Sequence, residues 1–296
     1  MNILIVKLNA TGDVVRTTSL LHRLQGQITW VTAKNNVALF EGLADNVRCV
    51  CWGTDEVASL HGTAFDLVLN LEDEVDTARF VQRVKYRQLF GAYVDDAGQV
   101  RYTDSAKAWF DLSIISVHGR KRADELKYQN RRSYQELVFE GLGFRFAGES
   151  YILPPAPLTD LRGDVAIAPV AGPVWPMKNW AYYDQLKSRL EAMGYSVNVL
   201  PRRETLLEHI GDIRGHRCLV GGDSLPMHLA LGVDVRCVTI FNCTSPWEIY
   251  DYGLQTQLVS PLLGEFFYKR TFDPRATTAI SLDTVLDAVL KKLCPR

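Results

Sequence analysis

Apolar and polar residues alternate along this chain in two successive series of the same kind. In the first series, short continuous apolar runs are separated by longer stretches in which apolar residues recur every three or four positions. Continuous apolar runs are typical of buried parallel strands, and the longer period is typical of helices. We expect strands at residues 3–6, 28–32, 47–51 and 65–70, and helices at 14–24, 36–43, 80–85, 106–117 and 133–141.

A proline-rich segment, residues 153–158, ends the first series and is the best candidate for a linker. The second series predicts strands at 165–170, 196–200, 218–220, 235–241 and 258–260, and helices at 181–192, 206–213 and 281–293. Two βαβ series predict an α/β protein with two Rossmann-like, doubly wound parallel-sheet domains facing each other across a cleft. In such domains ligands bind where strands end and helices begin.

The amino-acid composition limits which cellular compartment and which binding partners we expect. The 296 residues are enough for two domains of about 150 each. A hydrophobic content of 47%, a charged content of 23% and a net charge of -1 indicate a soluble globular protein with no general attraction to nucleic acid. We expect no signal peptide and no membrane span, and we interpret the six scattered cysteines as free thiols of a cytoplasmic protein.

The segment 221–230 carries the most informative candidate chemistry. Two glycines follow the strand 218–220, and Asp223 or Ser224 can cap the helix that comes next. The unpaired amides of that helix, with His228 one turn further on, would form a site for a phosphate. From these residues alone, an ordinary capped strand-to-helix turn explains the pattern equally well.

A second candidate follows the first strand, at residues 7–13. This turn lacks the G-x-G-x-x-G spacing of a dinucleotide site and offers instead the carboxylate of Asp13 beside Gly12. Capping of the following helix is the more common role for such an aspartate, so the turn by itself favours a cap.

Three further residues of the second series follow predicted strands. Lys178 lies in the aromatic and proline-rich loop 171–180, where a solvated surface lysine is the plainer interpretation. Thr244 precedes a predicted helix that it or its neighbour Ser245 could cap. Glu204 follows the strand 196–200 and could bind a ribose, or could pair with a neighbouring arginine.

A basic cluster between Arg120 and Arg132 stands out in the first series. Its lysines and arginines could contact anionic lipid headgroups or a phosphorylated acceptor. A solvated helix face, partly neutralised by Asp124 and Glu125, is the open alternative.

Taken together, four short motifs resemble those of glycosyltransferase family 9, the ADP-heptose:lipopolysaccharide heptosyltransferases. The resemblance covers most of the chain, and its specificity comes from the joint occurrence of the four motifs, in order, at strand ends. The motifs are Ile5-Val6-Lys7 to Gly12-Asp13, Trp175 to Trp180, Gly222 to His228, and Thr244 to Pro246.

The resemblance implies a GT-B fold in which residues 1–155 bind the acceptor and residues 156–280 bind the nucleotide-sugar, while a helix at 281–296 packs back on the N-terminal domain. It makes Asp13 the catalytic base, and we place Asn9, Thr11 and Gly12 on the acceptor side. It assigns the sugar diphosphate to Lys178, Asp223, Ser224 and His228, to which we add Gly222, Glu204 and Thr244 from their positions.

The expected reaction is an inverting, metal-independent transfer of a sugar, by family default heptose, from an ADP-sugar to a glycan or glycolipid hydroxyl such as lipopolysaccharide core. Residues 266–273 contain none of the cysteines that some members of the family carry there, so we expect no metal and no cofactor. The family's Phe-Gly-Pro-Thr turn is changed to Phe241-Asn242-Cys243-Thr244. We also expect peripheral contact with the inner membrane. Another sugar or acceptor, a nucleotide-sugar epimerase or hydrolase, and a nucleotide-sugar-binding protein without transfer activity are the alternatives.

Overall fold

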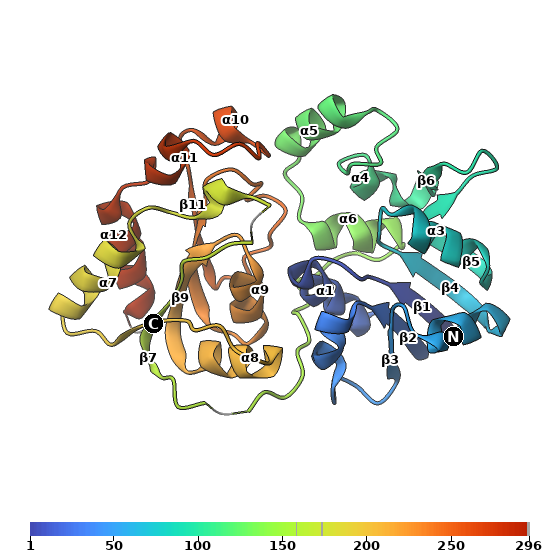
Figure 1. Cartoon of the computed structure of the whole chain (residues 1–296), viewed down its shortest axis with the longest axis horizontal. Coiled ribbons are helices and arrows are strands. Elements are labelled where there is room, and N and C mark those ends of the chain that lie inside the picture. The colour runs from blue at the N-terminus through green and yellow to red at the C-terminus, as the bar shows by residue number, and fades with distance from the viewer. Residues whose placement is uncertain (158, 173, 295–296) are drawn as a thin grey trace. The chain divides into compact units, whose positions relative to one another are not determined.

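The computed structural model describes residues 1–157, 159–172 and 174–294, and the chain divides into two compact units (Figure 1). The first unit is Met1–Pro155 and the second is Ala156–Arg296, so the division falls within the proline-rich segment. Each unit has its own sheet and its own apolar core. In the described residues, no helix is both long enough and apolar enough to cross a membrane.

The N-terminal unit is built on a six-stranded sheet with the strand order β3-β2-β1-β4-β5-β6. The first five strands are parallel, and β6 is an antiparallel edge strand paired with β5. The order reverses between β1 and β4, the point where doubly wound sheets bind ligands. The strands are β1 Asn2–Val6, β2 Gln27–Thr32, β3 Val47–Cys51, β4 Ala64–Asn70, β5 Lys85–Val94 and β6 Val100–Tyr102.

The helices of this unit are short, and several differ from the sequence prediction. The helix predicted at 14–24 is a single two-turn helix followed by a 3₁₀ turn, and the one at 36–43 is a 3₁₀ segment. Only four residues of the predicted helix 106–117 are α-helical. The helical segments are α1 Thr11–Thr17, η1 Thr18–His22, η2 Lys34–Phe40, α2 Asp55–Ser59, η3 Leu60–Gly62, α3 Val75–Gln82, η4 Asp104–Ala106, α4 Lys107–Phe110, α5 Arg120–Gln129 and α6 Tyr134–Gly141.

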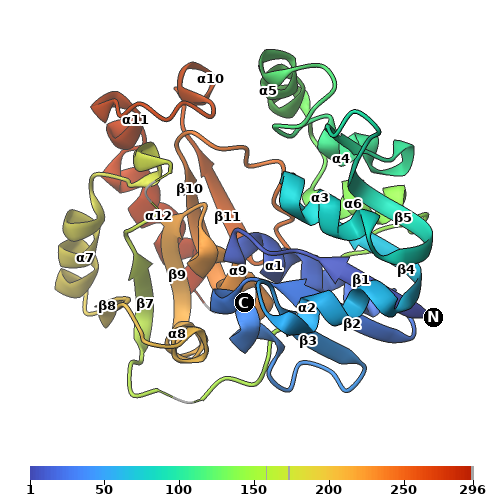
Figure 2. The same ribbon diagram turned by 45° about the vertical axis from the view of Figure 1, so that its right-hand side comes forward.

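The C-terminal unit has a five-stranded sheet, all parallel, in the order β11-β10-β9-β7-β8. Here the strand order reverses between β7 and β9, which lie side by side in Figure 2. The strands are β7 Gly163–Ala168, β8 Val197–Val199, β9 His216–Gly222, β10 Arg236–Phe241 and β11 Gln255–Val259.

The helices α7 and α12 cover one face of this sheet, and α8 and α9 cover the other (Figure 1). The helical segments are η5 Pro176–Lys178, α7 Tyr183–Ala192, α8 Leu206–Arg214, α9 Leu225–Gly232, α10 Leu263–Phe266, α11 Pro274–Thr278 and α12 Leu282–Leu293.

The last helix, α12, packs within its own unit. Its apolar residues Val285, Leu286 and Val289 join the core formed by β7, β9 and β10, and the helix contacts α7. This stripe is therefore buried in the C-terminal unit, and the expectation that residues 281–296 pack on the N-terminal domain stays a prediction.

Candidate active site

An ion pair lies at the carboxyl end of the C-terminal sheet, where the strand order reverses. Asp223 follows β9 directly, and Lys178 ends η5 in the loop that follows β7. The Lys178 ammonium donates one hydrogen bond to the Asp223 carboxylate at 3.0 Å and another to its backbone carbonyl at 2.6 Å. Each side chain is only 14% exposed. The structure therefore brings together two residues that the sequence analysis assigned to one sheet edge.

The surroundings keep the Asp223 carboxylate charged. Burial by itself would raise its pKa, but the positive charges of Lys178 and His228, with the Thr244 side chain, hold the pKa below its ordinary value. His228 is buried on α9, and Thr244 follows β10. Asp223, Lys178, His228 and Thr244 thus form one electrostatic group.

Two glycines at the end of β9 allow backbone segments to approach closely. A Cβ atom on Gly222 would lie 2.9 Å from the Lys178 carbonyl oxygen, and one on Gly221 would lie 3.1 Å from the Ala168 carbonyl oxygen. Neither glycine adopts a positive φ. Close packing therefore explains the glycines better than a left-handed turn does, and Gly222 in particular is required because the Lys178 segment packs directly on β9.

The helix α9 begins without a side-chain cap. Ser224 occupies the N-cap position in an extended conformation, and no side chain of the described residues caps it there. Its hydroxyl instead donates to the Gly222 carbonyl at 3.4 Å. No side chain of the described residues caps the first turn of α9. Pro226 has no amide hydrogen and the Met227 amide donates to the Ser224 carbonyl at 3.0 Å, so this terminus offers an anion the Leu225 amide and the positive end of the helix.

The turn after β10 lies at the same carboxyl edge of the sheet as Asp223. Asn242 donates through Nδ2 to the Met177 carbonyl at 3.0 Å and so attaches the turn to the Lys178 segment. Residues 242–250 form bends and turns rather than the helix we expected, so neither Thr244 nor Ser245 is a helix cap. Buried Asn242 Oδ1 and Ser245 Oγ have no hydrogen-bond partner among the described residues, which makes this turn able to accept further polar contacts.

Glu204 lies apart from the other residues that we predicted to bind the nucleotide-sugar. It is exposed and lies just before Thr205, which caps α8. Its neighbour Arg203 pairs with Asp212 through two hydrogen bonds of 2.6 and 2.8 Å, not with Glu204. In the described part of the chain no hydrogen bond or ion pair joins Glu204 to the group around Asp223.

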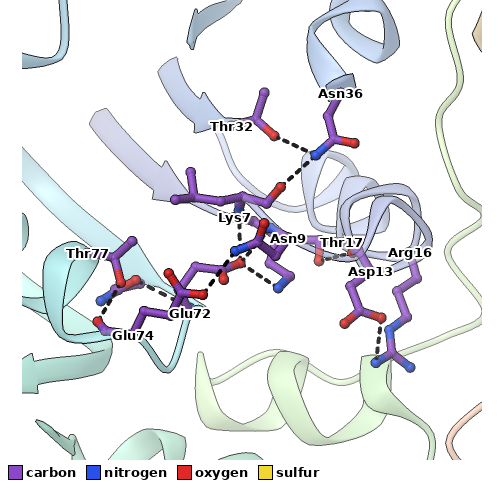
Figure 3. Close-up of polar contacts among 12 residues, drawn as sticks. Lys7, Asn9, Asp13, Arg16, Thr17, Thr32, Asn36, Glu72, Glu74 and Thr77 are labelled. Carbon is purple, nitrogen blue, oxygen red and sulfur yellow. Dashed lines mark hydrogen bonds and ion pairs between the residues drawn. The ribbon is translucent and has the colours of Figure 1, made fainter. Parts of the chain in front are cut away.

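The N-terminal unit holds a second buried ion pair at its own strand reversal. The Lys7 ammonium donates to Glu72 Oε1 at 2.6 Å, and the backbone amides of Leu8 and Asn9 donate to the same oxygen at 2.8 and 3.2 Å (Figure 3). Burial by itself would lower the pKa of Lys7, but the negative charges of Glu72 and Asp13 outweigh it and raise that pKa. The pair fixes the start of the turn that leads to α1.

Asp13 lies in the first turn of α1 and is not its N-cap. The N-cap is Ala10, held at a positive φ of 55°, a strained conformation for a residue with a side chain. The Asp13 carboxylate pairs with Arg16 at 3.0 Å and stays 31% exposed (Figure 3). The capping alternative that the sequence favoured is therefore wrong, and the carboxylate is paired and partly exposed.

The expected acceptor-side residues occupy the same turn. The Asn9 side chain donates to Glu74, and the Thr11 hydroxyl donates to Asn36 at 2.7 Å, while Gly12 lies in the first turn of α1. Asn9 is exposed, whereas the hydroxyl of Thr11 is engaged within the fold.

Sequence reasoning missed three charged residues at this edge: Arg16, Glu72 and Asp73. Glu72 and Asp73 follow β4 as Asp13 follows β1, so the strand-end rule that selected Asp13 could also have selected them. Burial and the neighbouring Glu72 charge raise the pKa of Asp73. Arg16 does not follow a strand, so the same rule does not select it. Its spacing from Asp13 on α1 is local, but its aromatic partners come from elements that the sequence does not place next to α1.

The fold described above is that of the GT-B glycosyltransferases. The structure is similar to E. coli heptosyltransferase WaaC with ADP, with a TM-score of 0.64 and 15% identity over 99% of this chain and 100% of that chain. It is similar to the family 9 glycosyltransferase from Veillonella parvula, with a TM-score of 0.69 and 16% identity over 99% and 97% of the two chains. It is also similar to the iron-containing dodecameric glycosyltransferase TibC from enterotoxigenic E. coli. That match has a TM-score of 0.62 and 13% identity over 99% of this chain and 78% of that chain.

The sequence gives a more specific match in the C-terminal unit. Residues 165–264 match the model of glycosyltransferase family 9 (heptosyltransferase), and this range includes Lys178 and the segment 221–230. No protein of curated function matches the chain in sequence. The chain is thus similar to glycosyltransferase family 9 in the sequence of its C-terminal unit and in fold over nearly its whole length, and the enzyme class supported is glycosyltransferase.

Proposed function

We propose that this protein transfers a sugar from an ADP-sugar to a hydroxyl group of a glycan or glycolipid, with inversion at the anomeric carbon. The observation that carries the proposal is the Lys178–Asp223 pair beside the uncapped start of α9. This pair lies at the strand reversal of the sheet whose sequence matches a glycosyltransferase family. Heptose is the sugar we favour, because that family is described as heptosyltransferase.

The C-terminal unit supplies the charge that a leaving diphosphate requires. An ammonium group has three donor hydrogens, and Lys178 uses two of them on Asp223, so one is left for a phosphate oxygen. The start of α9 adds the Leu225 amide and the positive end of the helix dipole. With His228 in the same group, these donors stabilise the charge that develops on the diphosphate, and we propose that no divalent cation is needed.

The N-terminal unit supplies the base. In the proposed step, the acceptor oxygen attacks the anomeric carbon while its proton moves to the Asp13 carboxylate. The bond from that carbon to the diphosphate oxygen breaks, and its electron pair leaves with the ADP. The partial exposure of Asp13 suits this role, because a general base must reach the hydroxyl it deprotonates.

The test is a transfer assay with a panel of nucleotide-sugars and candidate acceptor glycans, in which ADP release and product configuration are measured. We expect Asp13→Asn to lower kcat by about 10²–10⁴-fold with little change in donor affinity, because only proton transfer is lost. Asp55→Asn, which alters an exposed first-turn aspartate of α2, is the matched control.

Four outcomes would contradict this proposal. Near-normal turnover in Asp13→Asn would remove it as the base. ADP release that does not depend on an acceptor would indicate a hydrolase, and donor binding without ADP release would indicate a silent binding protein. Retention of configuration at the anomeric carbon would exclude the single displacement.

We further propose that the surface of residues 114–132 contacts a membrane that carries anionic lipids. This segment has six lysines and arginines against two acidic residues, and its side chains Ile114, Val117 and Tyr128 are exposed. Arg120 and Arg122 pair with the two acids on α5, which leaves the segment with net positive charge. Exposed apolar residues beside basic ones are typical of interfacial binding.

We place the reaction in a reducing compartment, the cytoplasm. All six cysteines are free thiols, and disulfides are rare where thiols are kept reduced.

A further inference from the structure

A buried arginine lies one helical turn after the proposed base. Arg16 and Asp13 are three residues apart on α1, so their side chains share one face of the helix. The guanidinium Nη2 atom lies 3.0 Å from Asp13 Oδ1, and the two side chains point toward one another (Figure 3). The Arg16 side chain is 6% exposed, against 31% for Asp13, so this pair has one partner fixed inside the fold and one at the surface.

Two aromatic rings hold the guanidinium group in place. Its central carbon lies 4.2 Å from the centre of the Tyr134 ring and 5.4 Å from that of Trp109, within the range of cation–π contacts. The two rings meet edge to face, with their centres 4.8 Å apart. Because Trp109 comes from α4 and Tyr134 from α6, three separate elements determine the position of this one guanidinium group.

The same elements are tied to the turn that carries Asp13. The hydroxyl groups of Tyr134 and Thr17 lie 2.7 Å apart, and the Thr17 hydroxyl donates to the Asp13 carbonyl at 2.6 Å. Tyr134 therefore supports both the side chain that pairs with Asp13 and the backbone of Asp13 itself.

The charges in this arrangement favour an ionised Asp13. A guanidinium group does not lose its proton in proteins, and a buried one is stable only with a compensating negative charge. Protonation of Asp13 would remove the negative charge that Arg16 contacts. The buried Lys7 ammonium adds a second positive charge on the same side, since Asp13 contributes to raising the pKa of Lys7.

We infer that Arg16, enclosed by Trp109 and Tyr134, is a positioning residue that keeps the Asp13 carboxylate ionised and fixes its orientation. The inference rests on the proposed function, in which Asp13 accepts the acceptor proton. A base must be ionised before it can accept a proton, and its oxygens must be aligned with the hydroxyl. Arg16 acts through Asp13 and need not touch the substrate.

The direct test is a pH titration of the Asp13 carboxyl carbon by ¹³C NMR, with the resonance assigned by its absence in Asp13→Asn. We expect Arg16→Met to move the Asp13 titration midpoint upward by about one pH unit or more, because a nearby opposite charge shifts a carboxyl group by about 1–3 units. Arg16→Lys keeps the charge and should give a smaller upward shift. An unchanged midpoint in Arg16→Met would overturn the inference.

Two further variants make the titration decisive. Arg48→Met removes an arginine of the same unit that pairs with Glu56 at the surface, and it should leave the Asp13 midpoint where it is. Trp109→Leu retains Arg16 but exposes one side of its guanidinium group to water. It should move the Asp13 midpoint upward by less than Arg16→Met does. This second variant tests the inference even where Arg16→Met fails to fold, and an unmoved midpoint there counts against it.

Transfer kinetics separate this inference from the proposed function. We expect Arg16→Met to lower kcat/KM and to move its acidic limb to higher pH, while adding no further loss in an Asp13→Asn background. If Asp13→Asn keeps normal transfer, the proposed base is wrong. If Asp13→Asn loses transfer but Arg16→Met keeps both a normal rate and an unshifted midpoint, only the inference about Arg16 fails.

Discussion

Lys7 carries a positive charge into the interior of the N-terminal unit, where Glu72 is its counter-charge. The Glu72 oxygen that accepts from Lys7 also accepts from two backbone amides of the turn that leads to Asp13. One carboxylate thus holds three donors from one loop. The pair is a structural support for the site, and its loss would leave a buried ammonium group without a compensating charge.

We predict that Glu72→Gln lowers the free energy of unfolding by about 3–5 kcal/mol, because the Lys7 charge stays buried without its partner. The pKa of Lys7 is raised in the folded protein, so the ion pair contributes its full stability at any pH below the ordinary lysine pKa of about 10.4. That stability is lost only as the pH rises through the raised pKa. Urea denaturation at pH 7 therefore measures the full contribution. Glu56→Gln, at the exposed Arg48 pair, should change stability by no more than about 1 kcal/mol.

At the residue scale, the sequence identifies side chains that follow strands and misses those that act through distant partners. Lys178 and Asp223 both lie in loops at the carboxyl ends of strands, so a strand-end rule selects them. Arg16 lies within α1, and its aromatic neighbours on α4 and α6 follow it by roughly 100 residues in the sequence. No local pattern encodes such a contact.

At the scale of elements, the segment that carries Lys178 is attached to the sheet by backbone packing. Gly222 lets this segment approach β9, and Asn242 holds it from the end of β10. The position of the Lys178 ammonium relative to α9 therefore depends on two neighbouring strands.

We predict that Gly222→Ala weakens donor binding and lowers the free energy of unfolding by about 1–3 kcal/mol, because the added Cβ lies 2.9 Å from a backbone oxygen and must displace the Lys178 segment. Calorimetry with ADP and urea denaturation measure the two effects. Gly62→Ala is the control, since a Cβ there meets no atom within 4 Å. Unchanged ADP affinity in Gly222→Ala would separate the packing of this segment from donor binding.

The elements that the sequence predicted poorly are those that tertiary pairing determines. The segment 85–94 was not predicted as a strand, because the first four residues of β5 are polar and exposed. Its strand conformation comes from parallel pairing with β4, from Ala64 opposite Lys85 to Asn70 opposite Gly91. The buried strands β1, β4, β7 and β9 carry continuous apolar runs and were predicted well.

At the scale of the whole molecule, the α/β class and the two sheets follow from the two apolar series. The division between the units lies at the proline-rich segment, where periodicity stops. The location of α12 did not follow from the sequence. An amphipathic C-terminal helix can bury its apolar stripe on any complementary surface, so the sequence does not say which surface that is. In the structure, the surface is formed by β9, β10 and α7.

We predict that the whole protein sediments with vesicles that contain anionic lipid and much less with neutral ones, because residues 114–132 combine positive charge with exposed apolar side chains. The double variant Ile114→Asp and Val117→Asp should reduce this binding without loss of folding, since both residues are exposed. Val259→Asp, an exposed residue of the C-terminal unit, is the control. Equal sedimentation with neutral and anionic vesicles would support the solvated-face alternative.

The central claim is that the C-terminal unit binds the diphosphate of an ADP-sugar at the Lys178–Asp223 edge of its sheet. Isothermal titration calorimetry of the full chain with ADP tests it most directly, with Lys178→Ala and the control Lys187→Ala, whose lysine pairs with Glu191 on α7. We predict that ADP binds the wild type and the control equally, and Lys178→Ala about tenfold or more weakly, a loss of about 1.4 kcal/mol or more. Absence of ADP binding, or equal affinity in Lys178→Ala, would contradict the claim.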